Sequence, residues 1–228
     1  MSRSPFQDRL QAGSRLLGTL VQIPHPEVAV QIGRQGFDWL FLDGEHGGFG
    51  PEEVTKTLTA LAGTTPCLVR VPTQDEAVIE AMMACGQTGI IVPHVDSAAQ
   101  AVAIVKQVGG RNLVVIQAES REAVAHIRDI VQVPGVDAVL VGPYDLTASL
   151  GIPEQFDHPA FREALGAIVE ACQGAHMPLG IFRMTPAEVF PHEGQGFTLL
   201  AVGLDGRLLE MGARGLLSEL RKGPYSGQ

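Results

Sequence analysis

Residues 113–141 read LVVIQAESREAVAHIRDIVQVPGVDAVLV, and this segment carries the clearest structural pattern in the chain. An apolar run from Leu113 to Gln117 is followed by a polar turn and by helical spacing over Arg121 to Val131. A Pro-Gly turn then leads into a second apolar run, Ala138 to Val141. Nearly continuous apolar runs are typical of strands in a parallel sheet, which is buried on both faces. The segment is therefore predicted to form a strand, a helix and a second strand.

The same alternation extends through the whole chain in both directions. The other predicted strands cover Leu16 to Val21, Asp38 to Leu42, Cys67 to Val71, Gly89 to Pro93, Leu179 to Phe182 and Leu199 to Val202. Amphipathic stretches between them predict outer helices over Pro51 to Ala62, Asp75 to Cys85, Ser97 to Val108 and Pro159 to Cys172. Eight strand–helix repeats favour an α/β fold of the closed (β/α)8 TIM barrel type, with a doubly wound open sheet as the second choice.

The length and the lack of any linker-like segment predict one domain spanning residues 1–228. Residues 1–13 are expected to form an N-terminal helix or extension, and residues 223–228 a flexible tail. Arg207 to Arg221 is amphipathic, and it is predicted either to close the barrel or to pack on a neighbouring subunit.

The composition excludes several classes of protein. A net charge of −9 and the absence of a basic cluster argue against a nucleic-acid partner. Three scattered cysteines without a CxxC spacing, Cys67, Cys85 and Cys172, argue against a disulfide framework and against a thiolate zinc site. No signal peptide or membrane span is readable, so we expect no membrane partner and a cytoplasmic location.

In barrels of this type, catalytic groups stand at the carboxyl ends of the strands. Glu119 and Asp145 fall at two such ends, and paired carboxylates with open positions suit Mg²⁺ or Mn²⁺. Gln117 shares the face of Glu119 because strand side chains alternate, so its amide is expected beside the metal. The competing interpretation makes both acids helix caps or surface residues.

The turn Gly142-Pro-Tyr144-Asp145 leads toward a helix start, where free backbone N–H groups favour an anion such as a carboxylate. Tyr144 and Asp145 would donate, since Pro143 has no N–H. Taken alone, the tetrapeptide also fits an ordinary Gly-Pro turn.

Two further strand ends carry candidate catalytic side chains. His46 lies three residues after Asp43, close enough for the carboxylate to orient the imidazole as a general base, although a lone histidine is more often structural. Arg70 ends the apolar run that begins at Cys67, so its charge is expected at the barrel mouth, where it can stabilise an enolate or oxyanion. The alternative for Arg70 is an ion pair with Glu45 or Asp43.

Together these segments resemble the HpcH/HpaI family of metal-dependent pyruvate aldolases. The resemblance spans about residues 14 to 220. It is carried by Phe37-Asp-Trp-Leu-Phe-Leu-Asp43-Gly-Glu-His46, Val69-Arg70-Val, Gln117-Ala-Glu119 and Val141-Gly-Pro-Tyr-Asp145-Leu-Thr-Ala-Ser-Leu-Gly.

The resemblance implies a class II aldolase that forms or cleaves 4-hydroxy-2-oxo acids from an aldehyde and pyruvate or another 2-oxo acid. A divalent ion, Mg²⁺, Mn²⁺ or Co²⁺, is implied on Glu119 and Asp145, with Gln117 beside it. Arg70 is implied to bind the enolate oxygen, and Asp43 with His46 to move the proton of the second substrate. The family also implies a homo-oligomer, a trimer or hexamer, with exchanged C-terminal helices.

Two departures separate this sequence from the family pattern. Relatives usually carry a longer segment near the active-site mouth before the fifth strand, whereas here only about Gln107 to Arg111 bridges the gap. Tyr144 stands where many members have a small residue, so it is expected to narrow the metal pocket or to offer a hydroxyl. Two other functions stay open: decarboxylation of oxaloacetate or a similar 2-oxo acid lyase reaction, and a non-catalytic binding or structural barrel.

Overall fold

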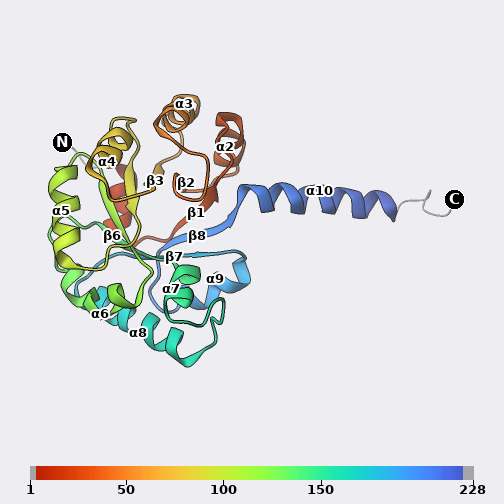
Figure 1. The fold of residues 1–228 in the computed structure, drawn as a ribbon. Helices are drawn as coiled ribbons and strands as arrows, with labels where there is room; N and C mark the ends of the chain where they lie inside the picture. Colours follow the sequence, from red (N-terminus) through yellow and green to blue (C-terminus); the bar gives the residue numbers. More distant parts are fainter. Residues whose placement is uncertain (1–3, 223–228) are drawn as a thin grey trace.

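The computed structural model describes residues 4–222, and in it eight parallel strands form a closed barrel in the order β1 to β8 (Figure 1). Strand β8 pairs with β1 and completes the ring. The strands are β1 Leu16–Val21, β2 Trp39–Asp43, β3 Cys67–Arg70, β4 Gly89–Val92, β5 Leu113–Ala118, β6 Ala138–Val141, β7 Leu179–Arg183 and β8 Leu199–Leu204. The predicted TIM barrel is confirmed, and each predicted strand coincides with an observed one to within one or two residues at its ends.

Helices follow the strands and surround the barrel (Figure 1). They are α1 Pro5–Gln11, α2 Pro26–Gly33, α3 Pro51–Leu61, α4 Glu76–Met83, α5 Ala98–Val108, α6 Arg121–Ile130, α7 Pro143–Ser149, α8 Pro159–Gly174, α9 Pro186–Glu193 and α10 Asp205–Arg221. Six of them begin with proline, whose fixed φ suits the first helical position. No helix among residues 4–222 combines the length and the apolar character needed to cross a membrane.

Alternation along the strands divides the apolar residues into two layers. Residues that point outward, such as Leu40 and Ile116, pack under the helices. Those that point inward, such as Phe41 and Val115, fill the barrel. Asp43, Gln117 and other residues at the carboxyl ends follow the same alternation, so their side chains enter the barrel mouth.

Trp39, the first residue of β2, lies inside the barrel near the amino ends of the strands, and Gly18 of the neighbouring strand leaves space for its side chain. A Cβ atom on Gly18 would stand 2.4 Å from the indole of Trp39, so only glycine fits here. Below this layer, Phe6 and Leu10 of α1 join the inner cluster and cover the amino ends of the strands. Within residues 1–13, the expected helix is therefore confirmed over Pro5–Gln11, whereas residues 1–3 lie outside the described part.

The short connection between α5 and β5 lies at the amino ends of the strands. Gly109 ends α5 in the left-handed conformation, with φ of +59°, and Leu113 begins β5. Helix-to-strand turns in a (β/α)8 barrel lie at the face opposite the active site. In this chain, therefore, the residues from Gln107 to Arg111 do not reach the barrel mouth.

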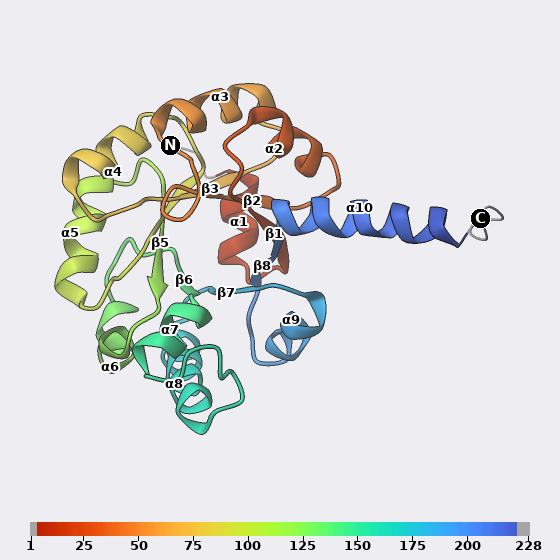
Figure 2. The ribbon, with the colours of Figure 1, turned by 45° about the vertical axis from the view of Figure 1, so that its right-hand side comes forward.

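Helix α10 projects away from the barrel in both views (Figures 1 and 2). Apart from Asp205, which is buried, its side chains are open to solvent, including Leu209, Leu216 and Leu220. The barrel is closed by β8 and β1, so the expectation that this helix closes its own barrel is wrong. The alternative, packing on a neighbouring subunit, stays a prediction. The predicted tail, residues 223–228, lies outside the described residues.

Candidate active site

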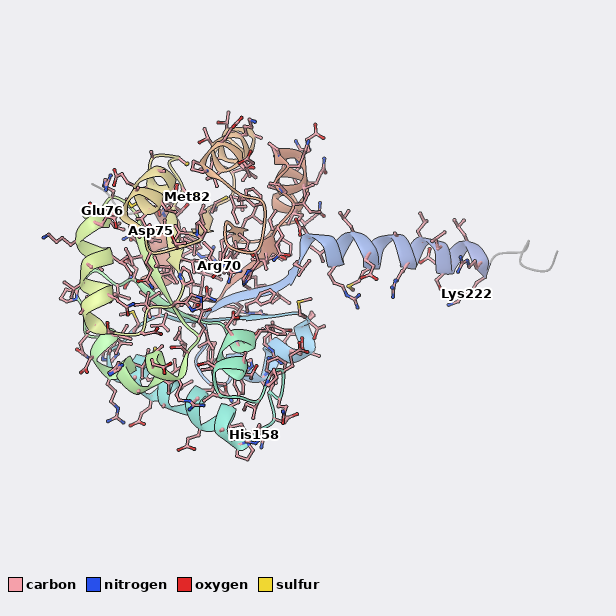
Figure 3. The ribbon with its side chains drawn as sticks, viewed as in Figure 1. Arg70, Asp75, Glu76, Met82, His158 and Lys222 are labelled. Carbon is pink, nitrogen blue, oxygen red and sulfur yellow. The ribbon has the colours of Figure 1, made fainter. Side chains whose placement is uncertain are left out.

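Asp43 and Arg70 form the centre of the polar cluster at the barrel mouth. They are paired positions on β2 and β3. Arg70 donates from Nε to Oδ1 of Asp43 at 2.9 Å and from Nη2 to Oδ2 at 2.8 Å. Both side chains are buried, and Figure 3 places Arg70 near the middle of the barrel. A bidentate pair of this kind fixes the plane of the guanidinium.

This pair sets the ionisation of both groups. Burial alone would raise the pKa of Asp43, but the bonds from Arg70 and Gln22 outweigh burial and hold that pKa below its ordinary value. Burial opposes the charge of Arg70 as well, and Asp43 and Glu45 raise its pKa in compensation. Asp43 is therefore a buried carboxylate, and Arg70 a buried cation. Both ion pairs considered from the sequence are present, since Nη1 of Arg70 also lies 3.0 Å from Oε2 of Glu45.

Gln22 and Asp205 were not predicted as part of this site, yet they help to build it. Gln22 donates from Nε2 to Oδ2 of Asp43 at 3.0 Å. Asp205 accepts from the backbone N–H groups of Gln22 and Ile23, at 3.0 and 2.7 Å, and holds the end of β1. Gln22 lies two residues beyond the inward-facing Leu20, so the alternation could have identified it.

His46 lies at the mouth, but its contact with Asp43 differs from the predicted one. The backbone N–H of His46 donates to Oδ1 of Asp43 at 3.1 Å. The imidazole is exposed, and its Nε2 lies 3.8 Å from Oε2 of Glu45. Asp43 therefore fixes the loop that carries His46, whereas Glu45 is the carboxylate nearest to the imidazole. The tight turn Asp43-Gly-Glu brings the backbone N–H, not the ring, toward Asp43.

Glu119 is buried beyond the end of β5 beside Gln117, as the alternation predicts. It accepts hydrogen bonds from Nε2 of Gln117 and, at 2.8 Å, from the backbone N–H of His94. Burial raises the pKa of Glu119 to about 8; the His94 N–H acts against this shift, and the charges of Asp145 and Glu45 add to it. A buried carboxyl with a raised pKa is a place where a bound cation would favour the ionised form.

Asp145 and Tyr144 belong to the first turn of α7, which begins directly after β6. Both line a cavity of about 270 Å³ at the barrel mouth, together with Arg70, Gln117 and His46. Tyr144 packs edge-on against Phe156, with ring centroids 5.2 Å apart, and lies 6.2 Å from Phe182. The structure thus brings the seven sequence-predicted site residues to one end of the barrel.

The oxygen atoms around Glu119 suit a hard divalent cation. Glu119 is hydrogen-bonded to Gln117, and Asp145 lines the mouth with Gln117 and acts on the charge of Glu119. Oε1 of Gln117 is buried without a hydrogen-bond partner among residues 4–222. Gly142 leaves space beside them, because a Cβ atom there would stand 2.7 Å from Gln117 Nε2 and from Glu119 Oε2. Residues 4–222 contain no group of three or more His, Cys, Asp and Glu side chains placed to hold a metal. Any cation here would take its remaining ligands from substrate or water.

Comparison with known proteins gives a consistent result. The profile of the HpcH/HpaI aldolase/citrate lyase family matches residues 17–211. A 4-hydroxy-2-oxovalerate aldolase of Rhodococcus jostii is 29% identical, in an alignment that covers 97% of each chain. A 4-hydroxy-2-oxo-heptane-1,7-dioate aldolase of Salmonella arizonae is 28% identical and covers 94% of this chain and 93% of its own.

Solved structures share the fold along nearly the whole chain. An HpcH/HpaI aldolase/citrate lyase family protein from Burkholderia cenocepacia superimposes with a TM-score of 0.91, at 24% identity, covering 95% of this chain and 98% of that one. The citrate lyase beta subunit of M. tuberculosis, complexed with oxaloacetate and magnesium, has a TM-score of 0.65 at 18% identity, covering 87% and 95%.

Proposed function

Because the chain belongs to the HpcH/HpaI aldolase/citrate lyase family, we propose that it is a divalent-metal-dependent aldolase that forms or cleaves 4-hydroxy-2-oxo acids. It is a carbon–carbon lyase by its family and by its full-length aldolase relatives. The observation that carries the proposal is the immobilised guanidinium of Arg70, which lines the same cavity as Gln117 and Asp145. A 2-oxo acid placed there meets a cationic donor that is already oriented.

Glu119 and Asp145 would hold the cation, with Gln117 beside them. A divalent ion supplies Lewis acidity, which polarises the ketone of pyruvate and lowers the cost of removing a methyl proton. The magnesium in the related citrate lyase beta subunit supports this choice of metal. The raised pKa of Glu119 also supports a cation at this site. A carboxyl group that stays protonated in the absence of a cation ionises when a cation binds beside it.

Arg70 would stabilise the enolate of pyruvate. Its Nε and Nη2 atoms are committed to Asp43, and Nη1 has Glu45 at 3.0 Å. The Glu45 contact is the one that a substrate oxygen can share or replace, because Nη1 carries two N–H groups. Asp43 and Gln22 thus act as positioning residues, and the charge of Arg70 is the group that meets the developing negative oxygen.

His46 would move the proton of the aldehyde-derived hydroxyl, through a water molecule. Its imidazole is exposed on the cavity side of a loop that Asp43 fixes through backbone N–H groups. Oε2 of Glu45 lies 3.8 Å from Nε2 of the imidazole and helps to orient the ring. Tyr144 narrows the cavity near Asp145, so it would limit the size of the 2-oxo acid or aldehyde that binds.

The partners that follow are pyruvate or a related 2-oxo acid, an aldehyde, and further copies of this chain. Helix α10 exposes Leu209, Met211, Leu216, Leu217 and Leu220 far from its own barrel. Burying such a row against a neighbouring copy would remove apolar surface from water. We therefore propose that α10 forms part of a homo-oligomer interface.

The first experiment follows the loss of the methyl protons of pyruvate in D₂O by NMR, because this exchange requires no choice of aldehyde. We expect exchange with Mg²⁺ or Mn²⁺, none with EDTA, and none in Glu119→Gln. Arg162→Gln, at a surface arginine that pairs with Asp157, is the matched control and should exchange like the wild type. If no divalent ion supports exchange, the aldolase proposal fails and a binding or structural barrel becomes the better account. Oxaloacetate consumption without an aldehyde would instead identify a decarboxylase.

A further inference from the structure

A second cavity, of about 980 Å³, lies between α8 and α9 on the outside of the barrel. Its lining includes Arg183, the last residue of β7. The neighbouring Phe182 lines the barrel mouth, and strand alternation therefore turns Arg183 outward toward the helices. His158, at the start of α8, also lines this α8–α9 cavity, and Figure 3 shows it at the rim of the molecule, away from Arg70.

Arg183 is a buried cation with few partners. It is 6% exposed, and its Nε and Nη1 atoms have no hydrogen-bond partner among residues 4–222. Nη2 lies 3.5 Å from Oε1 of Glu188, a long contact. The other oxygen of Glu188 accepts from the backbone N–H and the Oγ1 hydroxyl of Thr185, both at 2.8 Å. The same carboxylate therefore contacts both Arg183 and Thr185. Most N–H donors of the guanidinium are therefore buried and unsatisfied, a costly state that a ligand anion would relieve.

The surroundings of Arg183 allow an anion to approach. The ring of Phe156 covers the guanidinium, with its centroid 4.0 Å from Cζ, and Phe156 belongs to the connection between α7 and α8. His158, His192 and Arg162 also line the cavity. Acidic side chains are present too, but Asp157 is paired with Arg162 at 3.0 Å and Glu188 is engaged as described. Glu154 is the remaining carboxylate in the lining.

We propose that the α8–α9 cavity binds a small oxyanion, a carboxylate or phosphate group, through the free nitrogens of Arg183. Carboxylate and phosphate oxygens match the planar donors of a guanidinium and form its strongest hydrogen bonds. Because these nitrogens are buried under the ring of Phe156, binding requires that this ring move aside. Phe156 packs edge-on against Tyr144, which lines the mouth, so binding at Arg183 changes the support of the substrate pocket.

The test measures binding of inorganic phosphate and of malonate by titration calorimetry, with chloride at equal ionic strength as the reference. Oxalate and divalent cations are left out, because oxalate is itself a carboxylate that would compete for the cavity, and binding that persists in Arg183→Gln is assigned to the barrel mouth. We expect one saturable site in the wild type and at least about tenfold weaker binding in Arg183→Gln. Arg128→Gln, at a surface arginine that pairs with Glu170 outside the cavity lining, should bind as the wild type does.

A second variant tests the cavity without touching the charge. Gly166 lies on α8 in the lining, and a Cβ atom there meets no atom within 4 Å. Gly166→Phe should fill the cavity and abolish binding, while Gly166→Ala should retain it. Unchanged binding in Arg183→Gln, unchanged binding in Gly166→Phe, or no binding in the wild type would each overturn the proposal.

The source of the anion is settled by kinetics on the same variants. If the anion is a separate effector, added phosphate changes the wild-type KM for charged and uncharged aldehydes alike, and Arg183→Gln abolishes this response. If it is the distal group of the acceptor, KM rises only for an aldehyde that carries a carboxylate. This arm rests on the aldolase activity proposed above, whereas the binding measurement does not, so failure of either proposal is recognised separately.

Discussion

Arg70 and Asp43 occupy paired positions on adjacent strands, and the same register that joins β2 to β3 sets the guanidinium and the carboxylate face to face at 2.9 and 2.8 Å. The pairing of β2 with β3 therefore also assembles this part of the site. The buried charge of either residue is tolerated only because the other is present.

Replacing Arg70 should damage both stability and catalysis. Arg70→Ala leaves the carboxylate of Asp43 buried without its cation, and we expect a loss of about 3–5 kcal/mol in the free energy of unfolding. Pyruvate proton exchange should fall by roughly 10²–10³-fold. Arg70→Lys retains the charge but not the two parallel bonds and should be intermediate in both respects. Urea unfolding measures the stability, and NMR measures the proton exchange. Wild-type stability and exchange in Arg70→Lys would contradict the role assigned to the two parallel hydrogen bonds of the guanidinium.

Asp43 should make the protein sensitive to acid. Its pKa in the folded protein is lowered from 3.8, so the unfolded chain takes up this proton first as the pH falls. The stabilisation is complete above the unfolded pKa and is lost as the pH drops through the folded one. Below about pH 4, the free energy of unfolding of the wild type should therefore fall more steeply with decreasing pH than that of Asp43→Asn. The difference between the two slopes corresponds to the uptake of up to one proton on unfolding. Urea titrations at successive pH values measure this slope. Asp129→Asn, on the exposed face of α6, should retain the wild-type slope.

Gly142 should be needed for metal binding. In Gly142→Ala the new methyl group would stand 2.7 Å from Gln117 Nε2 and Glu119 Oε2, and both side chains would have to shift. We expect Mg²⁺ or Mn²⁺ affinity to fall by about 10–100-fold, the range for disturbed support of metal ligands. Calorimetric titration with Mn²⁺ measures the change. Gly174→Ala, where the added atom meets open space, serves as the control. Equal affinities in the two variants would argue against a cation at Glu119.

Replacing Gly18 by a larger residue should lower the stability of the protein while Trp39 is present. Gly18→Ala places a methyl carbon 2.4 Å from the indole, and overpacking of this kind costs about 1–3 kcal/mol. Adding Trp39→Leu should recover part of the loss, because the two residues are in contact and their effects are not additive. Unfolding free energies of the two single variants and the double variant give the coupling, and additive values would show that the methyl group is accommodated elsewhere.

The exposed face of α10 should control assembly. Leu216→Glu with Leu217→Glu changes side chains that are 61% and 49% exposed in the isolated chain, so the barrel itself should keep its stability. We expect the mass in light scattering to fall to that of one 24.2 kDa chain. Ser218→Glu provides the control for added charge. An unchanged oligomer, or a wild-type protein that is already monomeric, would remove α10 from the interface.

Much of the fold could be predicted from the sequence because a parallel barrel buries every strand. Each run of apolar residues, such as Leu113 to Gln117, is unbroken and bounded by turn residues. The alternation then fixes which residues at a strand end face inward, as for Gln117 and Glu119. Helices α2 and α9 were not predicted, because each buries a single side chain, Ala29 or Val189, and so gives little periodic signal. The equally short α4 buries three side chains and was predicted.

The site was harder to predict where backbone geometry decides the contact. Spacing alone suggested a ring contact between His46 and Asp43, whereas the turn after β2 presents a backbone N–H instead. The bond from Gln22 to Asp43 depends on how β1 lies beside β2. Arg183 carried no signal as a site residue, because only the cavity between α8 and α9 shows that its nitrogens lack partners.

The chemistry and the closure of this barrel occupy different parts of the chain. The seven predicted site residues lie between Asp43 and Asp145, on β2, β3, β5 and β6 or just beyond them, whereas β7 and β8 complete the ring against β1. Phe182, Met184 and Leu204 line the mouth and Asp205 holds the end of β1, but selection on the other residues of the last third of the sequence can act on stability with little effect on turnover. A directed-evolution programme would find stabilising changes most safely after residue 185, and new substrate preferences before residue 150.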